Sequence, residues 1–429
     1  MRIIQASNRR AVRRLVNRRE DTDPTIVGKV ARIIATVRRD GDTALLRYAQ
    51  RFDRLAGPVE VSRDEMQQAL RSIDHKLRTS LRTSATHIRR IARRQVPKGW
   101  RTSVRPGVEV EQRVCPLDRV GCYVPAGRYP LPSSLLMTAI PARVAGVTDV
   151  IVACPRPDET VLAAAAIAGV TQLFRLGGAH AVAALAYGTA TVPKVDKIVG
   201  PGNAYVAAAK AQVATDCPID FHAGPTEIVI IATGGRPAWI AADLIAQAEH
   251  DPDARAIVLT TNRDLADQID EQVRIRTLGE GPARASLQRH GVIVVTRNID
   301  ETVALSNEIA PEHLVCDRND IAQRTTRAGT VFVGPYAAQA AGDYATGSNH
   351  VLPTGGAARF RGGLSASDFV RVHSVQRITR VGLSALAPTI LPLAEAEVLT
   401  AHAESVRVRL RATPRRRTGR PTSKSGALP

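Results

Sequence analysis

The sequence has 429 residues, enough for two or three domains with cores of their own. Its 44% hydrophobic and 23% charged residues are typical of a folded, water-soluble chain and exclude a disordered or collagen-like one, and no apolar run is long enough to span a membrane. Five scattered cysteines without a Cys-x-x-Cys pair exclude a disulfide framework and a zinc–thiolate site, and they indicate reduced thiols in a cytoplasmic protein.

The net charge of +19 is concentrated in part at the C-terminus, where eight Lys and Arg residues follow Ser405 without an acidic partner after them. Residues 412–429 are also rich in Pro, Ser and Thr, so we predict a disordered basic tail. Such a tail can hold nucleic acid non-specifically, but a solvated appendage explains it more simply. We therefore expect no membrane contact and regard nucleic acid as an unlikely partner.

The first part of the chain is predicted to be helical. Residues 1–22 form an Arg-rich segment that we expect to be helical and that lacks the apolar stretch of a secretory signal. Val27, Val30 and Val37 lie on one apolar stripe of the next helix. A capping box from Ser62 to Glu65 predicts a second long helix.

Strands and helices alternate from about residue 108 onward, which is the rhythm of parallel sheets built from βαβ units. The turns Gly177–His180 and Gly200–Asn203 would place backbone N–H groups at helix N-termini, where a phosphate can bind. No Gly-x-Gly-x-x-Gly fingerprint is present, so ordinary tight turns explain them equally well.

A second series of the same rhythm begins near Glu227, and we therefore predict an α/β fold of two Rossmann-like parallel-sheet domains with helical N-terminal and C-terminal segments. We expect an N-terminal segment over residues 1–22 and a discontinuous first domain made of residues 23–104 and 225–363. The second domain would be residues 105–224, the C-terminal helical domain residues 364–411, and the tail residues 412–429.

A helix is predicted from Trp239 to Pro252, because apolar residues recur there at helical spacing. Gln247 and His250 are three residues apart in its last turn and leave the same face. An amide oxygen and an imidazole can together bind a metal ion, although His is also common at an ordinary helix end.

Glu312 and His313 follow Pro311 at a predicted corner. An imidazole can accept a proton near neutral pH, and a carboxylate can activate water, so the pair is a candidate for acid–base chemistry. An exposed polar corner is the simpler alternative. The Gly-rich, polar stretch 342–356 is unsuited to a core, and a later helix over 393–408 carries Glu397 and His402.

These motifs in their order resemble histidinol dehydrogenases over about residues 27–410. The resemblance rests on Arg-Val-Gly-Cys-Tyr-Val-Pro from residue 119, Pro-Leu-Pro-Ser-Ser-Leu-Leu-Met from 130, Val-Asp-Lys-Ile-Val-Gly-Pro-Gly-Asn from 195, Ala-Gly-Pro-Thr-Glu from 223, Gln-Ala-Glu-His from 247, Ala-Pro-Glu-His-Leu from 310 and Gly-Asp-Tyr-Ala-Thr-Gly-Ser-Asn-His from 342. It implies a homodimer with shared active sites that binds one Zn²⁺ per subunit and uses two equivalents of NAD per turnover to oxidise L-histidinol through L-histidinal to L-histidine.

The resemblance also implies roles for individual residues. The zinc ligands would be Gln247, His250, Asp343 and His402, the last reaching the partner's site. Glu312 would activate water, and His313 would be the general base. The substrate would contact Thr226, Gln247, His250, His313, Asp343, His350, Glu397 and His402, and NAD would contact Tyr123, His180 and Asn203.

Three positions depart from the family pattern. His180 stands where Gln commonly contacts NAD, Ala126 replaces a usual Gly, and Thr226 replaces a usual Ser. A dehydrogenase of the same family acting on another small polyol is the alternative function, although Glu397 and His402 favour a substrate that carries an imidazole. A nucleic-acid-binding protein on a degenerate scaffold is the remote alternative, suggested by the basic tail.

Overall fold

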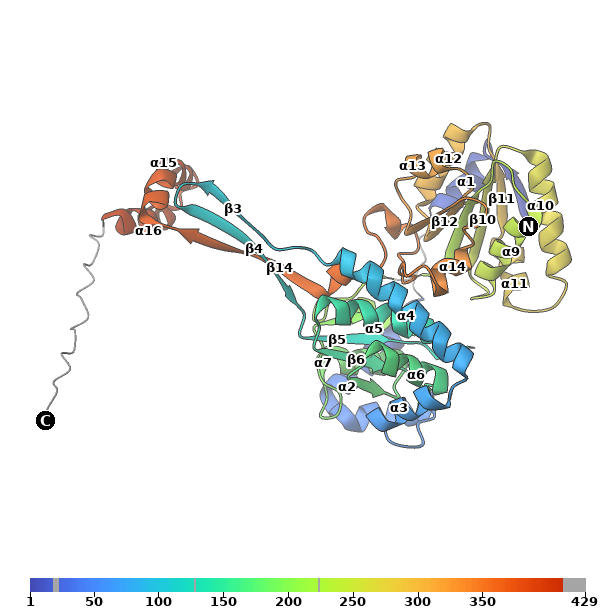
Figure 1. Cartoon of the computed structure of the whole chain (residues 1–429), viewed down its shortest axis with the longest axis horizontal. Coiled ribbons are helices and arrows are strands. Elements are labelled where there is room, and N and C mark those ends of the chain that lie inside the picture. The colour runs from blue at the N-terminus through green and yellow to red at the C-terminus, as the bar shows by residue number, and fades with distance from the viewer. Residues whose placement is uncertain (18–22, 127–128, 223, 412–429) are drawn as a thin grey trace, which may run out of the picture. The chain divides into compact units, whose positions relative to one another are not determined.

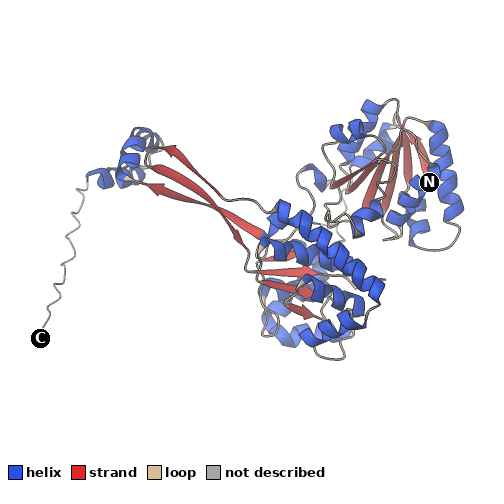
Figure 2. Ribbon diagram, in the orientation of Figure 1, coloured by secondary structure: helices blue, strands red, loops and turns tan. Residues whose placement is uncertain are grey.

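The computed structural model describes residues 1–17, 23–126, 129–222 and 224–411, so the predicted basic tail lies outside the described residues. The chain divides into two compact units, Met1–Val96 with Pro116–Val370 and Pro97–Cys115 with Arg371–Pro429. The first unit contains two sheets flanked by helices, which confirms the predicted α/β class (Figures 1 and 2).

The first sheet has five strands in the order β2-β7-β6-β5-β8. Its strands β5 to β8 are parallel, and the short β2 is antiparallel to β7. The strands are β2 (Glu60–Val61), β5 (Arg119–Tyr123), β6 (Asp149–Ala153), β7 (Gln172–Phe174) and β8 (Lys197–Val199). Strands β6 to β8 lie where the sequence rhythm predicts strands, whereas β5 was not predicted as one. Their buried residues are apolar because both faces of the sheet are covered.

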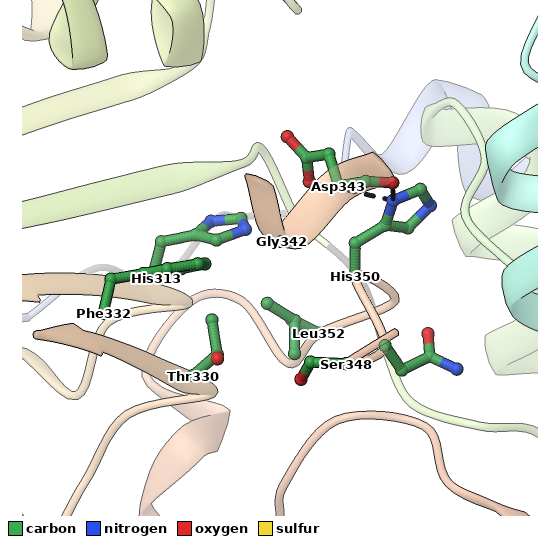
Figure 3. A pocket seen from close by; sticks show the side chains of 9 residues that line it. His313, Thr330, Phe332, Gly342, Asp343, Ser348, His350 and Leu352 are labelled. Carbon is green, nitrogen blue, oxygen red and sulfur yellow. Dashed lines mark hydrogen bonds and ion pairs between the residues drawn. The ribbon is translucent and has the colours of Figure 1, made fainter. Parts of the chain in front are cut away.

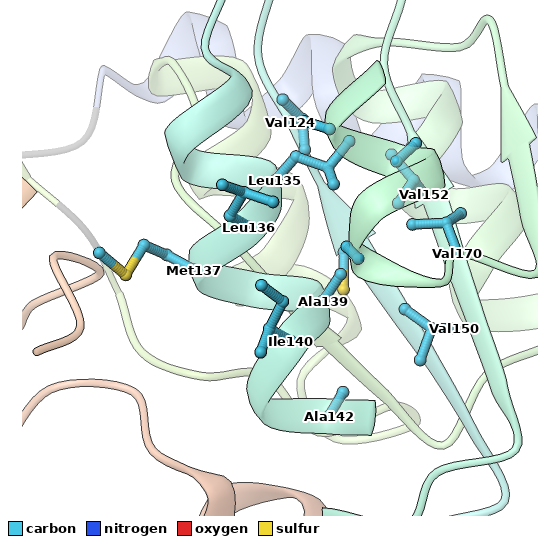
Figure 4. Close-up of a cluster of buried hydrophobic side chains, with 14 of the residues drawn as sticks. Val124, Leu135, Leu136, Met137, Ala139, Ile140, Ala142, Val150, Val152 and Val170 are labelled. Carbon is cyan, nitrogen blue, oxygen red and sulfur yellow. The ribbon is translucent and has the colours of Figure 1, made fainter. Parts of the chain in front are cut away.

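Successive residues of β6 enter two different cores. Val150 and Val152 pack on one face, with helices α3 to α6, whereas Ile151 and Ala153 pack on the other, with α2, α7 and α8. Figure 4 shows the first core around α5. The helices are α2 (Pro24–Tyr48), α3 (Arg63–Ser72), α4 (His75–Gln95), α5 (Pro132–Ala145), α6 (Glu159–Ala168), α7 (Gly178–Tyr187) and α8 (Ala204–Val213).

Helices α2 to α4 therefore belong with the sheet of residues 105–224. We expected residues 23–104 to join residues 225–363 instead, and this expectation is wrong for these helices. The predicted second long helix is also two helices, because Ile73 is extended and Asp74 caps α4. An apolar stripe indicates that a helix face is buried, but it does not indicate against which sheet.

The second sheet has six strands in the order β1-β11-β10-β9-β12-β13, and all paired neighbours are parallel. These strands are β1 (Arg2–Gln5), β9 (Glu227–Ile231), β10 (Arg255–Thr260), β11 (Val292–Val295), β12 (His313–Cys316) and β13 (Thr330–Val333). Its helices are α1 (Arg9–Val16), α9 (Pro237–Ala248), α10 (Arg263–Arg276), α11 (Pro282–His290), α12 (Ile299–Ile309), α13 (Asn319–Arg324) and α14 (Gln339–Tyr344).

We expected the N-terminal segment to be helical, but its first residues form a strand. Residues 2–5 form β1, whose register runs from Arg2 opposite Val292 to Gln5 opposite Val295. Pairing with the edge of β11 satisfies backbone groups that a four-residue segment with a few apolar side chains cannot satisfy alone.

The second unit contains a three-stranded sheet of β3 (Trp100–Arg105), β4 (Val108–Pro116) and β14 (Val370–Ile378), followed by α15 (Arg380–Ala396) and α16 (Thr400–Arg411). We predicted a wholly helical segment over 364–411, so β14 corrects that prediction. The helix expected over 393–408 is also interrupted, because Val398 has a left-handed φ of 61° between α15 and α16. No helix in the described part of the chain is both long and apolar enough to cross a membrane.

Candidate active site

A chain of hydrogen bonds joins three of the predicted site residues at the amino ends of β9 and β12 in the six-stranded sheet. The Gln247 amide nitrogen donates to the Thr226 hydroxyl, which donates to Glu312 Oε2 at 2.6 Å. The backbone N–H of Glu227 donates to the same carboxylate oxygen at 2.8 Å. The Thr226 hydroxyl thus links Gln247 to Glu312, and the methyl group that distinguishes Thr from the usual Ser does not prevent either hydrogen bond.

Glu312 and His313 are buried, with only 6% and 4% of their surface exposed, so they do not form an exposed polar corner. Ala310 adopts a left-handed φ of 50° that ends α12, and β12 begins at His313. The two side chains, which we assigned to separate tasks, lie close together: His313 Nδ1 is 3.6 Å from Glu312 Oε2. That nitrogen also lies 3.2 Å from the carbonyl oxygen of Glu227.

The protonation of His313 is set by two opposing influences. Burial disfavours the charged imidazole, but Glu312, with a smaller contribution from Asp343, outweighs it and raises the pKa of His313 above its ordinary value. A raised pKa makes His313 a stronger proton acceptor, which suits a general base.

A small cavity lies beside His313, and its lining includes Asp343 and His350 (Figure 3). Gln339 donates to Asp343 Oδ2 at 2.7 Å, and His350 Nδ1 lies 3.1 Å from the Asp343 carbonyl. Burial, together with His313 and His250, outweighs the effect of Asp343 and lowers the pKa of His350. His350 is therefore held neutral, with its other ring nitrogen 3.3 Å from the hydroxyl of Ser134 on α5.

The Gly-rich stretch that contains Asp343 and His350 is held by the five-stranded domain. Asn349 donates from its amide to the carbonyl of Met137 on α5 at 2.7 Å. His87 Nδ1 on α4 lies 2.6 Å from the carbonyl oxygen of Ala345. This stretch was recognised in the sequence as unsuited to a core, and in the structure it forms one wall of the cavity.

The residues expected to bind zinc suit a metal ion in one specific respect. Gln247 is fully buried, and its amide oxygen has no hydrogen-bond partner. A buried carbonyl oxygen left without a donor is costly, and a metal ion would satisfy it. We expected His250 to lie in the last turn of this helix, but it is exposed and follows the end of α9.

Within the described ranges, no three His, Cys, Asp or Glu side chains gather as a complete metal site. A site that includes the amide of Gln247 and a histidine of another subunit would not form such a group. His402 and Glu397 lie in the second unit, where both are exposed. Among the described residues, their side chains have no hydrogen-bond or ion-pair partner, so both remain free to contact another molecule.

The residues expected to contact NAD lie at the carboxyl edge of the five-stranded sheet. Tyr123 ends β5 and is buried, and its hydroxyl oxygen accepts the Gly178 N–H at 3.0 Å. Asn203 caps α8 by accepting from the N–H groups of Tyr205 and Val206. The turns thus place helix N-termini at a sheet edge where nucleotides commonly bind.

His180, the departure from the family pattern, is turned toward the protein interior. It is buried, and its Nε2 lies 2.7 Å from Oδ2 of Asp53. The same oxygen accepts the Gly177 N–H at 2.8 Å. Asp53 therefore holds the turn that begins α7 and also contacts His180.

Sequence reasoning missed Asp53, Lys210 and Asp220. Lys210 and Asp220 form a buried ion pair, in which Lys210 also donates to the Gly200 carbonyl at 2.8 Å and Asp220 accepts the Gly200 N–H at 2.7 Å. The signal was an acidic or basic residue at an otherwise buried helical position, as for Lys210 within apolar α8.

The five cysteines are free, as predicted, and all but Cys115 are buried. Burial raises the pKa of Cys122 and Cys154 to about 12 and that of Cys217 and Cys316 to about 11. These four thiols are therefore poor nucleophiles at neutral pH.

Comparison with known proteins identifies one family across nearly the whole chain. The family model described as histidinol dehydrogenase matches residues 16–410. The histidinol dehydrogenase of Methanothermobacter thermautotrophicus is 46% identical over 425 residues, which cover 96% of this chain and 99% of that relative. That of Geobacter sulfurreducens is 44% identical over 413 residues, covering 92% and 96%. The crystal structure of histidinol dehydrogenase from Elizabethkingia anophelis matches with a TM-score of 0.90 at 32% identity, covering 96% of this chain and 98% of that one.

Proposed function

Because this chain belongs to the histidinol dehydrogenase family, we propose that it oxidises L-histidinol through L-histidinal to L-histidine with NAD as hydride acceptor and one zinc ion per subunit. It is an oxidoreductase of histidine biosynthesis. The observation that carries the proposal is the chain of contacts from Gln247 through Thr226 to Glu312 and His313, with Asp343 and His350 lining the same cavity as His313.

The zinc ligands in this proposal are Gln247, His250 and Asp343 of one subunit and His402 of the other. The unpartnered amide oxygen of Gln247 supports the assignment. When bound, zinc would orient the amine and imidazole of the substrate, and NAD would accept the hydride. Glu397, which is exposed and without a partner among the described residues, would contact the substrate imidazole.

The proton transfers fall to the buried pair. His313 accepts the hydroxyl proton of L-histidinol as the hydride leaves the adjacent carbon, and its raised pKa supports this role. Glu312 accepts a proton from the water that adds to L-histidinal, and a second hydride then leaves the hydrated aldehyde. Thr226 and the Glu227 N–H hold the carboxylate in place for this step. His350, which burial holds neutral, lines the same cavity as His313 and would contact the substrate there.

NAD would occupy the carboxyl edge of the five-stranded sheet, at Tyr123 and Asn203. The two glycine turns and the helix N-termini that follow them support this placement. His180 would act through Asp53 and the turn, since its Nε2 is engaged with that carboxylate. The enzyme would work as a cytoplasmic homodimer, consistent with its free cysteines and with the unpartnered side chains of His402 and Glu397.

The test is to measure NADH formed per L-histidinol consumed, with and without zinc. We expect two equivalents of NADH, accumulation of L-histidine, and loss of activity with a chelator that zinc restores. A single equivalent with release of the aldehyde, or faster turnover of another small polyol, would contradict the proposal. A salt titration of nucleic-acid binding tests the remote alternative, which requires affinity that survives loss of Glu312 and His313 and falls steeply with salt.

A further inference from the structure

The six-stranded sheet contains a second hollow, separate from the cavity beside His313. It is an open hollow at the carboxyl ends of β9, β12 and β13. Its lining comes from the end of β9, the loop and first turns of α9, the end of β12 and the residues after β13. None of these residues serves the proposed dehydrogenase chemistry.

The position of this hollow follows from the sheet topology. The chain passes from β9 to β10 and β11 on one side, and β12 pairs with β9 on the other, so the strand order reverses between β9 and β12. Open parallel sheets bind ligands outside the strand ends at such a reversal. The five-stranded sheet reverses in the same way between β5 and β8, where we place NAD.

The lining carries a carboxylate without a partner. Asp243 on α9 faces the hollow among the apolar side chains of Ile230, Ile240 and Val315. Among the described residues it makes no hydrogen bond or ion pair, and burial raises its pKa to about 6. A partly buried carboxylate that remains ionised at neutral pH favours contact with a donor, and no group in the described ranges supplies one.

An aromatic ring lies one helical turn away from Asp243. Trp239 lines the hollow with 41% of its surface exposed, and the ring of Tyr336 lies 5.8 Å from it. The Arg236 guanidinium lies 4.8 Å from the Trp239 centroid, so this ring already attracts a cation. Gly234 and Gly235 leave open space at the rim, since a Cβ atom at either would meet nothing within 4 Å.

The charges of the lining determine whether a cation or an anion is favoured in the hollow. Asp243 and Asp317 contribute two negative charges and Arg236 one positive charge, which leaves the hollow negative. Asp317 Oδ2 already accepts from the Thr233 hydroxyl and N–H, each at 2.8 Å, and from the Gly234 N–H, whereas its buried Oδ1 has no hydrogen-bond partner among the described residues. Both carboxylates of the lining therefore offer a free acceptor to a cation. A phosphate or carboxylate ligand would be repelled, in contrast to the proposed NAD edge.

We propose that this hollow binds a small organic cation that carries a flat ring, with its ammonium group on Asp243 and its ring against Trp239. The combination of a carboxylate and an indole face is well suited to such a cation, because each attracts positive charge and the apolar walls exclude water. The site is independent of zinc, of NAD and of the proposed oxidation.

The test uses the fluorescence of Trp239 in the full-length, zinc-loaded enzyme. The chain has two tryptophans, so Trp100→Phe leaves Trp239 as the only one. Benzylammonium, benzyl alcohol and benzoate share one ring and differ in charge, and none has the imidazole of the substrate. At about pH 8, where Asp243 is ionised, we expect saturable quenching by benzylammonium alone.

Asp243→Asn should weaken benzylammonium binding at least about tenfold, whereas Glu271→Gln, which neutralises an exposed carboxylate on α10 of the same domain, should leave it unchanged. Arg236→Ala should tighten it, because the competing cation on Trp239 is removed. Saturable binding of benzoate or of adenosine monophosphate with equal affinity would overturn the proposal. Unchanged binding in Asp243→Asn, or no saturation with benzylammonium, would also overturn it.

Discussion

Glu312→Gln tests the proposed division of labour between Glu312 and His313. The amide keeps the shape of the carboxylate and can still accept from the Thr226 hydroxyl and the Glu227 N–H, at present 2.6 and 2.8 Å away. The variant therefore loses one negative charge and the ability to take a proton from water, while its contacts are kept.

The lost charge has a large effect on its neighbour. Two unit charges separated by the 3.6 Å between Glu312 Oε2 and His313 Nδ1 attract by about 5 kcal/mol at an effective dielectric constant of about 20. Without this attraction, burial becomes the larger influence and lowers the pKa of His313. If His313 must be neutral to accept the alcohol proton, the rise of rate with pH should move to lower pH in Glu312→Gln.

The second oxidation should suffer far more than the first. Loss of a general base typically costs about 10²–10⁴-fold in rate, or about 3–5 kcal/mol in activation free energy. We therefore expect the variant to release L-histidinal and to form one NADH per L-histidinol. His313→Asn should be slowed mainly in the first step, and its rate should no longer rise with pH through the imidazole range.

The assay compares kcat/KM for L-histidinol and for L-histidinal across pH. Glu308→Gln is the matched control, because it neutralises an exposed carboxylate of α12 only four residues away. Thr226→Val removes one hydrogen bond to Glu312 without removing its charge, so it should keep both steps at reduced rate. Equal losses on both substrates in Glu312→Gln and His313→Asn would show that the pair acts as one unit and refute the reasoning.

Three further predictions concern the subunit arrangement, the NAD edge and the pH dependence of stability. Inactive His402→Ala and Gln247→Leu variants should regain activity when their subunits exchange, because a hybrid dimer can assemble one intact site; no recovery despite demonstrated exchange would refute the shared site. Asp53→Asn should raise the KM for NAD about tenfold with little change in kcat, because Asp53 Oδ2 holds both the Gly177 N–H and His180. The control variant Asp42→Asn loses its hydrogen bonds to Thr191 elsewhere and should leave the KM for NAD unchanged. Asp243→Asn should stabilise the enzyme by about 1 kcal/mol at about pH 8, as measured by urea denaturation. The folded-state pKa of Asp243 is raised from 3.8 to about 6, which corresponds to at most about 3 kcal/mol. The expected gain is smaller because the carboxylate is partly exposed. Since the folded-state pKa exceeds the unfolded one, wild-type stability falls as pH rises from about 4 to about 6, and the advantage of the variant should disappear below that window; an equal gain at every pH would contradict it.

Local sequence was sufficient for the order of the elements and for several of their ends. The capping box of Ser62 and Glu65 forms as predicted, Asn203 caps α8, and most of the parallel strands, β6 and β9 among them, lie where the βαβ rhythm places them. These features depend on backbone hydrogen bonds and caps within a few residues, and such local bonds leave a direct pattern in the sequence.

Of the residues assigned through the family resemblance, His313, Asp343 and His350 line the cavity. By themselves, Glu312 and His313 were more simply explained as an exposed polar corner, whereas the structure buries both and brings their side chains within 3.6 Å. Burial decides their chemistry, because the pKa of His313 depends on how completely water is excluded and on which carboxylates remain nearby.

Other features depend on segments far apart in the chain and were decided by tertiary structure alone. Asp53 reaches Gly177 and His180, Arg2–Gln5 becomes a strand because β11 offers a free edge, and α2 to α4 cover the five-stranded sheet. Periodicity indicates that a face is buried, and composition indicates that a residue is polar. Neither indicates which distant segment the face or the polar group contacts. That contact is decided only when two distant surfaces pack together and each buried polar group must find a donor or acceptor there.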